Sequence, residues 1–134
     1  MAATPLMMPD TGPARILVVD DNQSVRRALC RLLTVEDCVV CGQAGDGADA
    51  IEAARRLTPN LIVMDLSMPG MSGIDAAREI CREFPTMSVL LMTEPDPEIV
   101  AAARRLGIRG TVSKVGNILG GVRAVLRGDE FFDP

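Results

Sequence analysis

The stretch Arg15-Ile-Leu-Val-Val-Asp-Asp21 decides the fold. In it, four consecutive apolar residues are followed at once by two carboxylates, Asp20 and Asp21. A short apolar run without polar alternation is typical of a strand that is buried on both faces, as in the middle of a parallel sheet. The stretch therefore predicts a buried strand that ends in charged groups.

A similar arrangement, a polar residue at the end of a short expected strand, recurs at Asp65, Thr93 and Lys114. The preceding runs are Leu61-Ile-Val-Met64, Val89-Leu-Leu-Met92 and Thr111-Val-Ser113, and Ser67-Met-Pro-Gly70 lies just beyond Asp65. In a parallel sheet such strand ends lie side by side at one edge, where open α/β sheets place their sites. We therefore expect three carboxylates, a hydroxyl and an ammonium to converge there. Such a group can bind a divalent cation and accept a phosphoryl group on an aspartate.

Strand and helix patterns alternate five times along the chain. The expected strands are residues 15–19, 38–41, 61–64, 89–92 and 110–112, and a helical pattern follows each of them. The first helix is expected at 23–33 and the last at about 117–127. Between them, helix starts are indicated by Asp46, Ser72-Gly73 and Asp96-Pro97, and helix ends by Pro59, Pro85 and Gly107. The alternation predicts an α/β domain with a five-stranded parallel sheet and helices on both faces.

Length and composition fit one domain without a membrane span. The chain has 134 residues, 48% of them apolar, and its net charge of −4 argues against direct binding of nucleic acid. Its apolar runs are far too short to cross a bilayer. Residues 1–13 contain no Lys or Arg and no long apolar stretch, so we interpret them as a flexible tail rather than a signal peptide. We expect residues 14–128 to form the domain and the chain to stay in the cytoplasm.

Histidine is absent from the sequence, which excludes several kinds of site. No His-based zinc site and no Ser-His-Asp or Cys-His catalytic arrangement can form. Cys38 and Cys41 have the spacing of redox and zinc sites, but they fall on an expected strand, where residues three apart point to opposite faces. We interpret them as small buried or half-buried thiols. If phosphohistidine takes part, the histidine must belong to another protein.

Four motifs taken together resemble the receiver domain of bacterial response regulators. They are Leu17-Val-Val-Asp-Asp21, Asp65-Leu-Ser-Met-Pro-Gly-Met-Ser-Gly73, Thr93 and Lys114. The resemblance covers about residues 15–128. It implies the flavodoxin-like receiver fold, in which the five strands have the order 2-1-3-4-5.

The resemblance also implies a role for each site residue. Asp65 would accept the phosphoryl group, Lys114 would pair with Asp65 and then with a phosphate oxygen, and Thr93 would donate its hydroxyl to the phosphate. Mg²⁺ would be bound by Asp21, Asp65 and the Ser67 carbonyl, with Asp20 holding a bound water. Without the metal, three carboxylates so close together should repel one another, so we expect a raised pKa for at least one of them.

Three positions depart from the family pattern. Glu94 stands where a small residue usually follows the threonine, and Pro95 and Pro97 stiffen the same loop. Thr111 occupies a place that is often aromatic in the family, so an aromatic switch cannot operate there. Val115 replaces a proline that often has a cis bond, and we expect a trans bond because a cis bond before a non-proline residue costs about 2.5–4 kcal/mol. These changes leave metal binding and phosphoryl acceptance intact but alter the relay from phosphate to output surface.

The leading hypothesis is a phosphorylation switch that is not itself an enzyme. A partner histidine kinase would phosphorylate Asp65 in a Mg²⁺-dependent step. Phosphorylation would then change either self-association as a homodimer or the activity of an attached domain. Residues 129–134 resemble the start of a linker to a LuxR-type helix-turn-helix domain, through which alone DNA would be bound. The alternative is a binding module that works without phosphate. A third hypothesis is an enzyme, either an aspartyl phosphatase or a flavin binder. An aspartyl phosphatase would need a second acid at position 67, where Ser67 stands. A flavin binder is disfavoured because Asp20 and Asp21 would repel the phosphate of the flavin.

Overall fold

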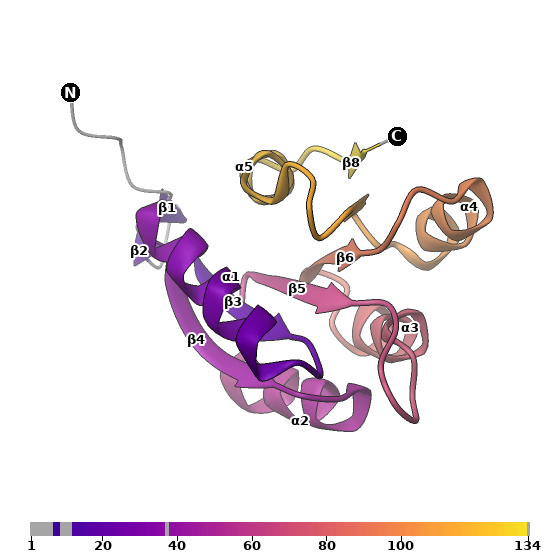
Figure 1. The fold of residues 1–134 in the computed structure, drawn as a ribbon, viewed down its shortest axis with the longest axis horizontal. Helices are drawn as coiled ribbons and strands as arrows, with labels where there is room; N and C mark the ends of the chain where they lie inside the picture. Colours follow the sequence, from indigo (N-terminus) through magenta and orange to yellow (C-terminus); the bar gives the residue numbers. More distant parts are fainter. Residues whose placement is uncertain (1–6, 9–11, 37, 134) are drawn as a thin grey trace.

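The computed structural model describes residues 7–8, 12–36 and 38–133, and from Arg15 onward strands and helices alternate along the chain (Figure 1). The strands are β1 (Met7–Met8), β2 (Gly12–Pro13), β3 (Arg15–Val19), β4 (Val39–Ala44), β5 (Leu61–Asp65), β6 (Ser88–Met92), β7 (Gly110–Val112) and β8 (Phe131–Phe132). The helices are α1 (Gln23–Val35), α2 (Gly47–Leu57), α3 (Gly73–Glu83), α4 (Pro97–Leu106) and α5 (Ile118–Leu126).

Strands β3 to β8 form one sheet in the order β4-β3-β5-β6-β7-β8, and every neighbouring pair is parallel. Counted along the chain, the first five of these strands have the order 2-1-3-4-5, so the predicted topology is confirmed. The predicted number of five strands is wrong, because β8 adds a sixth strand beside β7. A strand of two residues carries no periodic pattern, so only its pairing with β7 identifies it.

The β7–β8 pairing depends on a glycine. Gly110 lies opposite Phe131, and a Cβ atom at Gly110 would overlap the Phe131 carbonyl. Two backbone hydrogen bonds hold the strand, from Phe131 N to Arg109 O at 3.0 Å and from Asp133 N to Thr111 O at 3.0 Å. Within residues 129–134, Phe131 and Phe132 thus form an edge strand, and the linker to a further domain stays a prediction.

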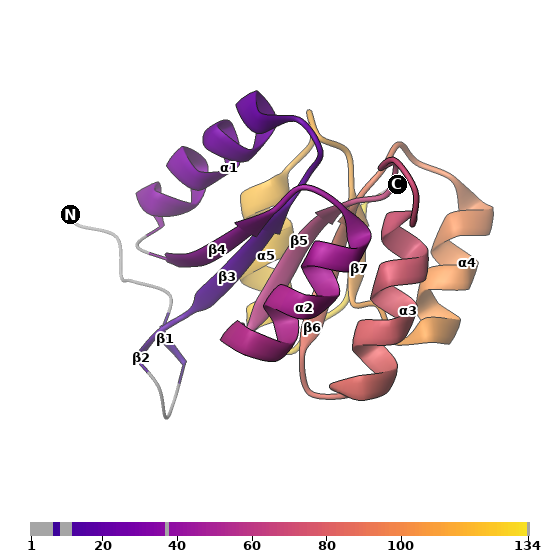
Figure 2. The same cartoon turned by 90° about the horizontal axis from the view of Figure 1, so that it is seen from below.

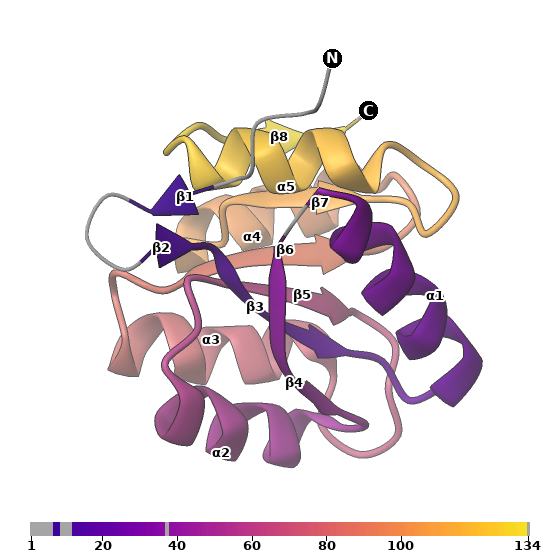
Figure 3. The same ribbon diagram turned by 90° about the vertical axis from the view of Figure 1, so that its left-hand side faces the viewer.

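Side chains alternate along the strands, so each face of the sheet has its own core. Ile16 and Val18 pack with α1 and α5, whereas Leu17 and Val19 pack with α2, α3 and α4. All four side chains are completely buried, and burial of each contributes about 1.5–3 kcal/mol. Figures 2 and 3 show α2 and α3 side by side on one face, with α1 and α5 on the other. This confirms the predicted placement of helices on both faces.

Each helix begins at a side chain that caps its first turn. The capping residues, which accept hydrogen bonds from backbone N–H groups, are Asn22, Asp46, Ser72, Asp96 and Asn117. The predicted starts at Asp46, Ser72-Gly73 and Asp96-Pro97 are confirmed, and so is Gly107, whose φ of 86° ends α4. Several elements differ from their expected bounds: α1 extends to Val35, β4 runs from Val39 to Ala44, β5 includes Asp65, and β6 begins at Ser88. β4 is longer because β3 pairs with it as far as Ala44.

The N-terminal segment is described only in part. Met8 pairs with Gly12 in a short antiparallel ladder between β1 and β2. The predicted flexible tail at residues 1–13 falls mainly outside the described residues, and the domain limits at residues 14 and 128 stay predictions. Among the described helices, none has the length and apolar character needed to cross a bilayer.

Candidate functional site

The carboxyl ends of four neighbouring strands surround one pocket. Asp20 follows β3, Asp65 ends β5, Thr93 follows β6, and Lys114 lies two residues beyond β7. The pocket has a volume of about 520 Å³, and its lining comprises Asp21, Asn22, Val25, Asp65, Ser67, Met92, Thr93, Glu94 and Lys114. The parallel register of the sheet brings these strand ends together. The structure therefore gathers the residues that the sequence predicted at this edge.

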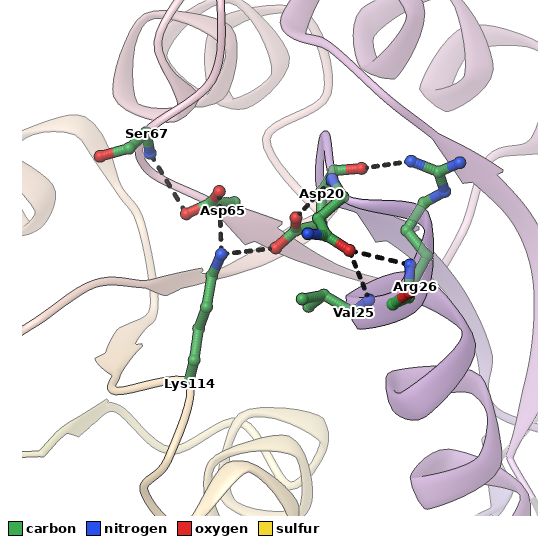
Figure 4. A network of polar contacts seen from close by, with 8 residues as sticks. Asp20, Val25, Arg26, Asp65, Ser67 and Lys114 are labelled. Carbon is green, nitrogen blue, oxygen red and sulfur yellow. Dashed lines mark hydrogen bonds and ion pairs between the residues drawn. The ribbon is translucent and has the colours of Figure 1, made fainter.

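Lys114 forms ion pairs with two buried carboxylates (Figure 4). Its Nζ lies 2.8 Å from Asp20 Oδ2 and 3.1 Å from Asp65 Oδ2. The predicted contact with Asp65 is present, and the contact with Asp20 is additional. Burial lowers the pKa of Lys114, but hydrogen bonds with Asp20 and Asp65 outweigh this and leave the pKa above its ordinary value. The ammonium therefore stays charged at neutral pH.

Three carboxylates lie close enough to share one cation. Asp20, Asp21 and Asp65 each offer one oxygen, and these oxygens lie within 4.8 Å of one another. Asp20 Oδ2 is buried, and it shares the single Lys114 ammonium with Asp65. Oxygen donors of this kind suit a hard cation such as Mg²⁺. The donor set therefore fits a divalent cation.

Asp65 is only 4% exposed. Its pKa is raised, mainly by burial, while a hydrogen bond from Lys114 and one from the Ser67 N–H (3.2 Å to Oδ1) oppose the rise. The negative charge of Asp20 adds to it. The expected direction of the pKa shift is confirmed, but burial rather than repulsion is its largest cause.

Thr93 and Glu94, on the loop between β6 and α4, line the pocket. The Thr93 hydroxyl donates to the Glu94 carbonyl at 3.2 Å, and the Glu94 carboxylate accepts a hydrogen bond from Ser113 Oγ at 3.0 Å. This hydrogen bond connects the loop after β6 with the loop after β7. Glu94 is exposed, so water screens its negative charge.

The other departures from the family pattern also have definite places. Thr111 is 3% exposed on β7, so a small buried side chain occupies the position that is often aromatic. The peptide bond before Val115 is trans, as every described peptide bond is, and this confirms the expectation. Val115 itself is 93% exposed.

One contact at the site was not predicted. Arg26, on the first turn of α1, donates from Nη1 to the Asp20 carbonyl at 2.6 Å. The sequence placed this residue only within the helix expected at residues 23–33. Its spacing from Asn22 puts it one turn after the helix cap, but no local pattern indicates which atom its guanidinium contacts.

Comparisons with known proteins agree with this geometry. Residues 16–119 match the family model of the response regulator receiver domain. Transcriptional regulatory protein LiaR of Bacillus subtilis (strain 168) is 35% identical over 120 residues, which cover 86% of this chain and 57% of LiaR. Protein-glutamate methylesterase/protein-glutamine glutaminase 4 of Myxococcus xanthus (strain DK1622) is 40% identical over 105 residues, 76% of this chain and 30% of that protein.

A solved structure extends the comparison to three dimensions. The LuxR-family two-component response regulator from Aurantimonas sp. SI85-9A1 matches with a TM-score of 0.86 and 31% identity, covering 90% of this chain and 90% of that chain. By contrast, this chain spans little more than half of LiaR and less than a third of the Myxococcus protein.

Proposed function

The chain belongs to the response regulator receiver domain family, and on that premise we propose that it is a phosphorylation-dependent signalling switch with Asp65 as phosphoryl acceptor. One observation carries the proposal: Asp65 lies at the rim of the sheet, 3.1 Å from the Lys114 ammonium and within the acidic cluster of Asp20 and Asp21. The chain's only lysine is thus placed where an incoming phosphate would need positive charge.

In the proposed reaction, an Asp65 carboxylate oxygen attacks the phosphorus of a phosphohistidine on a partner kinase. A P–O bond forms and the P–N bond breaks, and the imidazole, protonated on its other nitrogen, leaves as the neutral ring. Lys114 offsets charge on the transferred phosphoryl group. Thr93 would donate its hydroxyl to a phosphoryl oxygen after releasing the Glu94 carbonyl.

The carboxylates of Asp20, Asp21 and Asp65 and the Ser67 carbonyl would hold Mg²⁺. When bound, the ion neutralises charge on the carboxylates and on the phosphoryl oxygens. Asp20 supports this assignment because its carboxylate is completely buried and shares the single Lys114 ammonium with Asp65. The chain's own contribution is to keep these oxygens together before the ion arrives.

The partners follow from the same proposal. The given sequence has no histidine, so the proposed donor of the phosphoryl group is a phosphohistidine on a partner histidine kinase. Phosphorylation would then change homodimer formation, with the α4–α5 surface the first to test, or the activity of a LuxR-type output domain that binds DNA. A cytoplasmic location belongs to this proposal. The methylesterase activity of the Myxococcus relative is not carried over, since this chain covers only 30% of that protein.

A second candidate function is a binding module that works without phosphate. The hydrogen bond between Ser113 and Glu94 and the buried Thr111 favour it, because both differ from the usual relay between phosphate and output surface. Titration with Mg²⁺ and beryllofluoride separates the two functions. A switch should change its dimerisation or its hydrogen exchange in the loops after Thr93 and Lys114, whereas a phosphate-independent module should change neither.

The direct test is incubation with acetyl phosphate and Mg²⁺, read by intact mass. The wild type should gain the mass of one phosphoryl group, and Asp65→Asn should gain none. Asp129→Asn, which changes an exposed aspartate far along the chain, is the matched control and should react like the wild type. An unmodified wild type, or equal modification of Asp65→Asn, would contradict the proposal.

A further inference from the structure

Two adjacent residues, Asp20 and Asp21, contribute oxygens to the same acidic cluster. In an extended strand, adjacent side chains point to opposite faces. The backbone must therefore turn between these two residues for both carboxylates to meet. β3 ends at Val19, and the Asp20 N–H still donates to the Ala44 carbonyl at 3.1 Å. The turn thus involves the Asp20–Asp21 peptide, whose oxygen is the Asp20 carbonyl.

Arg26 holds this carbonyl (Figure 4). Its Nη1 donates to Asp20 O at 2.6 Å, a hydrogen bond that is partly buried. Hydrogen bonds with an ionised donor are shorter and stronger than neutral ones. A Cβ atom built at Gly45 would lie 3.5 Å from the same Nη1, so the guanidinium lies against the turn that follows β4. Arg26 therefore joins α1 to the ends of two neighbouring strands.

The loop between Asp20 and Arg26 is closed by further hydrogen bonds. Asn22 N donates to Asp20 Oδ1 at 2.9 Å, and Arg26 N donates to Asn22 O at 3.1 Å. The Asn22 side chain also caps α1 by accepting from two backbone N–H groups. These bonds fix the Asp20 side chain and the helix start, but the Asp20 carbonyl depends on the Arg26 side chain.

We propose that Arg26 is a positioning residue for the acidic cluster. Its guanidinium fixes the Asp20–Asp21 peptide, so that the Asp21 carboxylate faces Asp20 and Asp65 before a divalent cation arrives. Its observed contact is with the Asp20 backbone carbonyl and not with a carboxylate of the cluster. The positioning role is argued from the contacts of Arg26. The identity of the cation as Mg²⁺ and the phosphoryl-transfer reaction rest on the function proposed above.

Mg²⁺ titration calorimetry tests the proposal with three variants. Arg26→Met keeps the apolar stem and removes the donors, and it should weaken Mg²⁺ binding by about tenfold, as loss of a residue that orients a metal ligand does. Arg26→Lys should be intermediate, because an ammonium can also donate to a carbonyl. Arg27→Met changes the exposed neighbour on the same helix and should bind like the wild type. Equal affinity in Arg26→Met and the wild type would overturn the proposal.

Phosphorylation kinetics separate positioning from a general structural role. In Arg26→Met, the Mg²⁺ concentration for half-maximal reaction with acetyl phosphate should rise about tenfold, while the limiting rate at saturating Mg²⁺ stays that of the wild type. A lost limiting rate that excess Mg²⁺ does not restore would count against positioning. If the wild type accepts no phosphoryl group, the proposed function fails while the calorimetric comparison still stands.

If Arg26→Met does not fold, nuclear magnetic resonance of the wild type tests the same proposal. The Arg26 guanidinium protons should exchange with water more slowly than those of Arg27, and their resonances should shift when Mg²⁺ is added. Arg26 protons that exchange as fast as those of Arg27, or that do not respond to Mg²⁺, would overturn the proposal.

Discussion

Lys114 faces two carboxylates that are almost completely withdrawn from water, Asp20 at 0% and Asp65 at 4% exposed. One ammonium cannot offset the three carboxylates of the cluster, and burial makes the remaining charge costly. The raised pKa of Asp65 reflects this cost. A divalent cation would supply the missing positive charge, so the arrangement that weakens the free fold is the one that favours metal binding.

The first prediction is that Asp65→Asn stabilises the metal-free protein. Because the folded pKa of Asp65 lies above its unfolded value near 3.8, ionisation favours the unfolded state, and this cost develops as the pH rises from 3.8 through the folded pKa. In EDTA at pH 7 the variant should therefore have a Tm higher by about 2–5 °C. The difference should vanish below pH 3.8, as thermal unfolding across a pH series can show.

Asp129→Asn is the control for this prediction, since Asp129 is exposed and should give no comparable gain. A Tm of Asp65→Asn equal to or below that of the wild type at pH 7 would contradict the explanation. So would a gain that grows on acidification.

Local sequence signals are sufficient to predict some helices and strands but not others. The helix starts at Asp46 and Asp96 follow from capping side chains, so local sequence predicts them well. β8 has no such signal, and it exists because Gly110 leaves room for the Phe131 carbonyl. Its two phenylalanines pack on opposite faces of the sheet, and Phe132 also lies under Arg104 of α4, with 4.5 Å from the guanidinium carbon to the ring centre.

The second prediction is that Gly110→Ala detaches β8. The added methyl group should lower the free energy of unfolding by about 1–3 kcal/mol. Hydrogen exchange should show faster exchange of the Phe131 and Asp133 amides, which donate to β7 and its preceding residue. In a variant truncated after Gly128, Gly110→Ala should lower the free energy of unfolding by a smaller amount, because the Phe131 carbonyl that would overlap the methyl group is absent. Unchanged protection of both amides would show that β8 tolerates the methyl group.

For the whole molecule, the parallel sheet connects the site to the fold. Residues from 20 to 114 in the sequence meet at one edge because β3, β5, β6 and β7 are neighbours in register. Both faces of these strands are covered by helices, so the edge is held by two cores at once. A ligand that binds several strand ends should therefore stabilise the entire domain.

The third prediction is that Mg²⁺ raises the stability of the whole domain. A ligand that binds only the folded state contributes about 2.7 kcal/mol at a concentration of 100 Kd. Asp21→Asn should remove most of this gain, yet its metal-free stability should stay within about 0.5 kcal/mol of the wild type, since Asp21 is exposed. Thermal unfolding in MgCl₂, compared with NaCl of equal ionic strength, measures the gain. An equal gain in Asp21→Asn would remove that residue from the proposed ligands.

The sequence by itself determined the buried strands, their order along the chain, most helix boundaries and the polar residue at the end of each central strand. These features depend on local patterns, such as apolar runs, capping side chains and turn residues. The order of the strands within the sheet was implied by the family resemblance. Only the tertiary structure decided that Lys114 pairs with Asp20 as well as Asp65, that Arg26 holds the Asp20 carbonyl, and that Phe131–Phe132 forms a sixth strand. The physical reason is that each of these contacts depends on how the backbone places specific atoms in space, and no apolar run, cap or turn signal in the sequence encodes that placement.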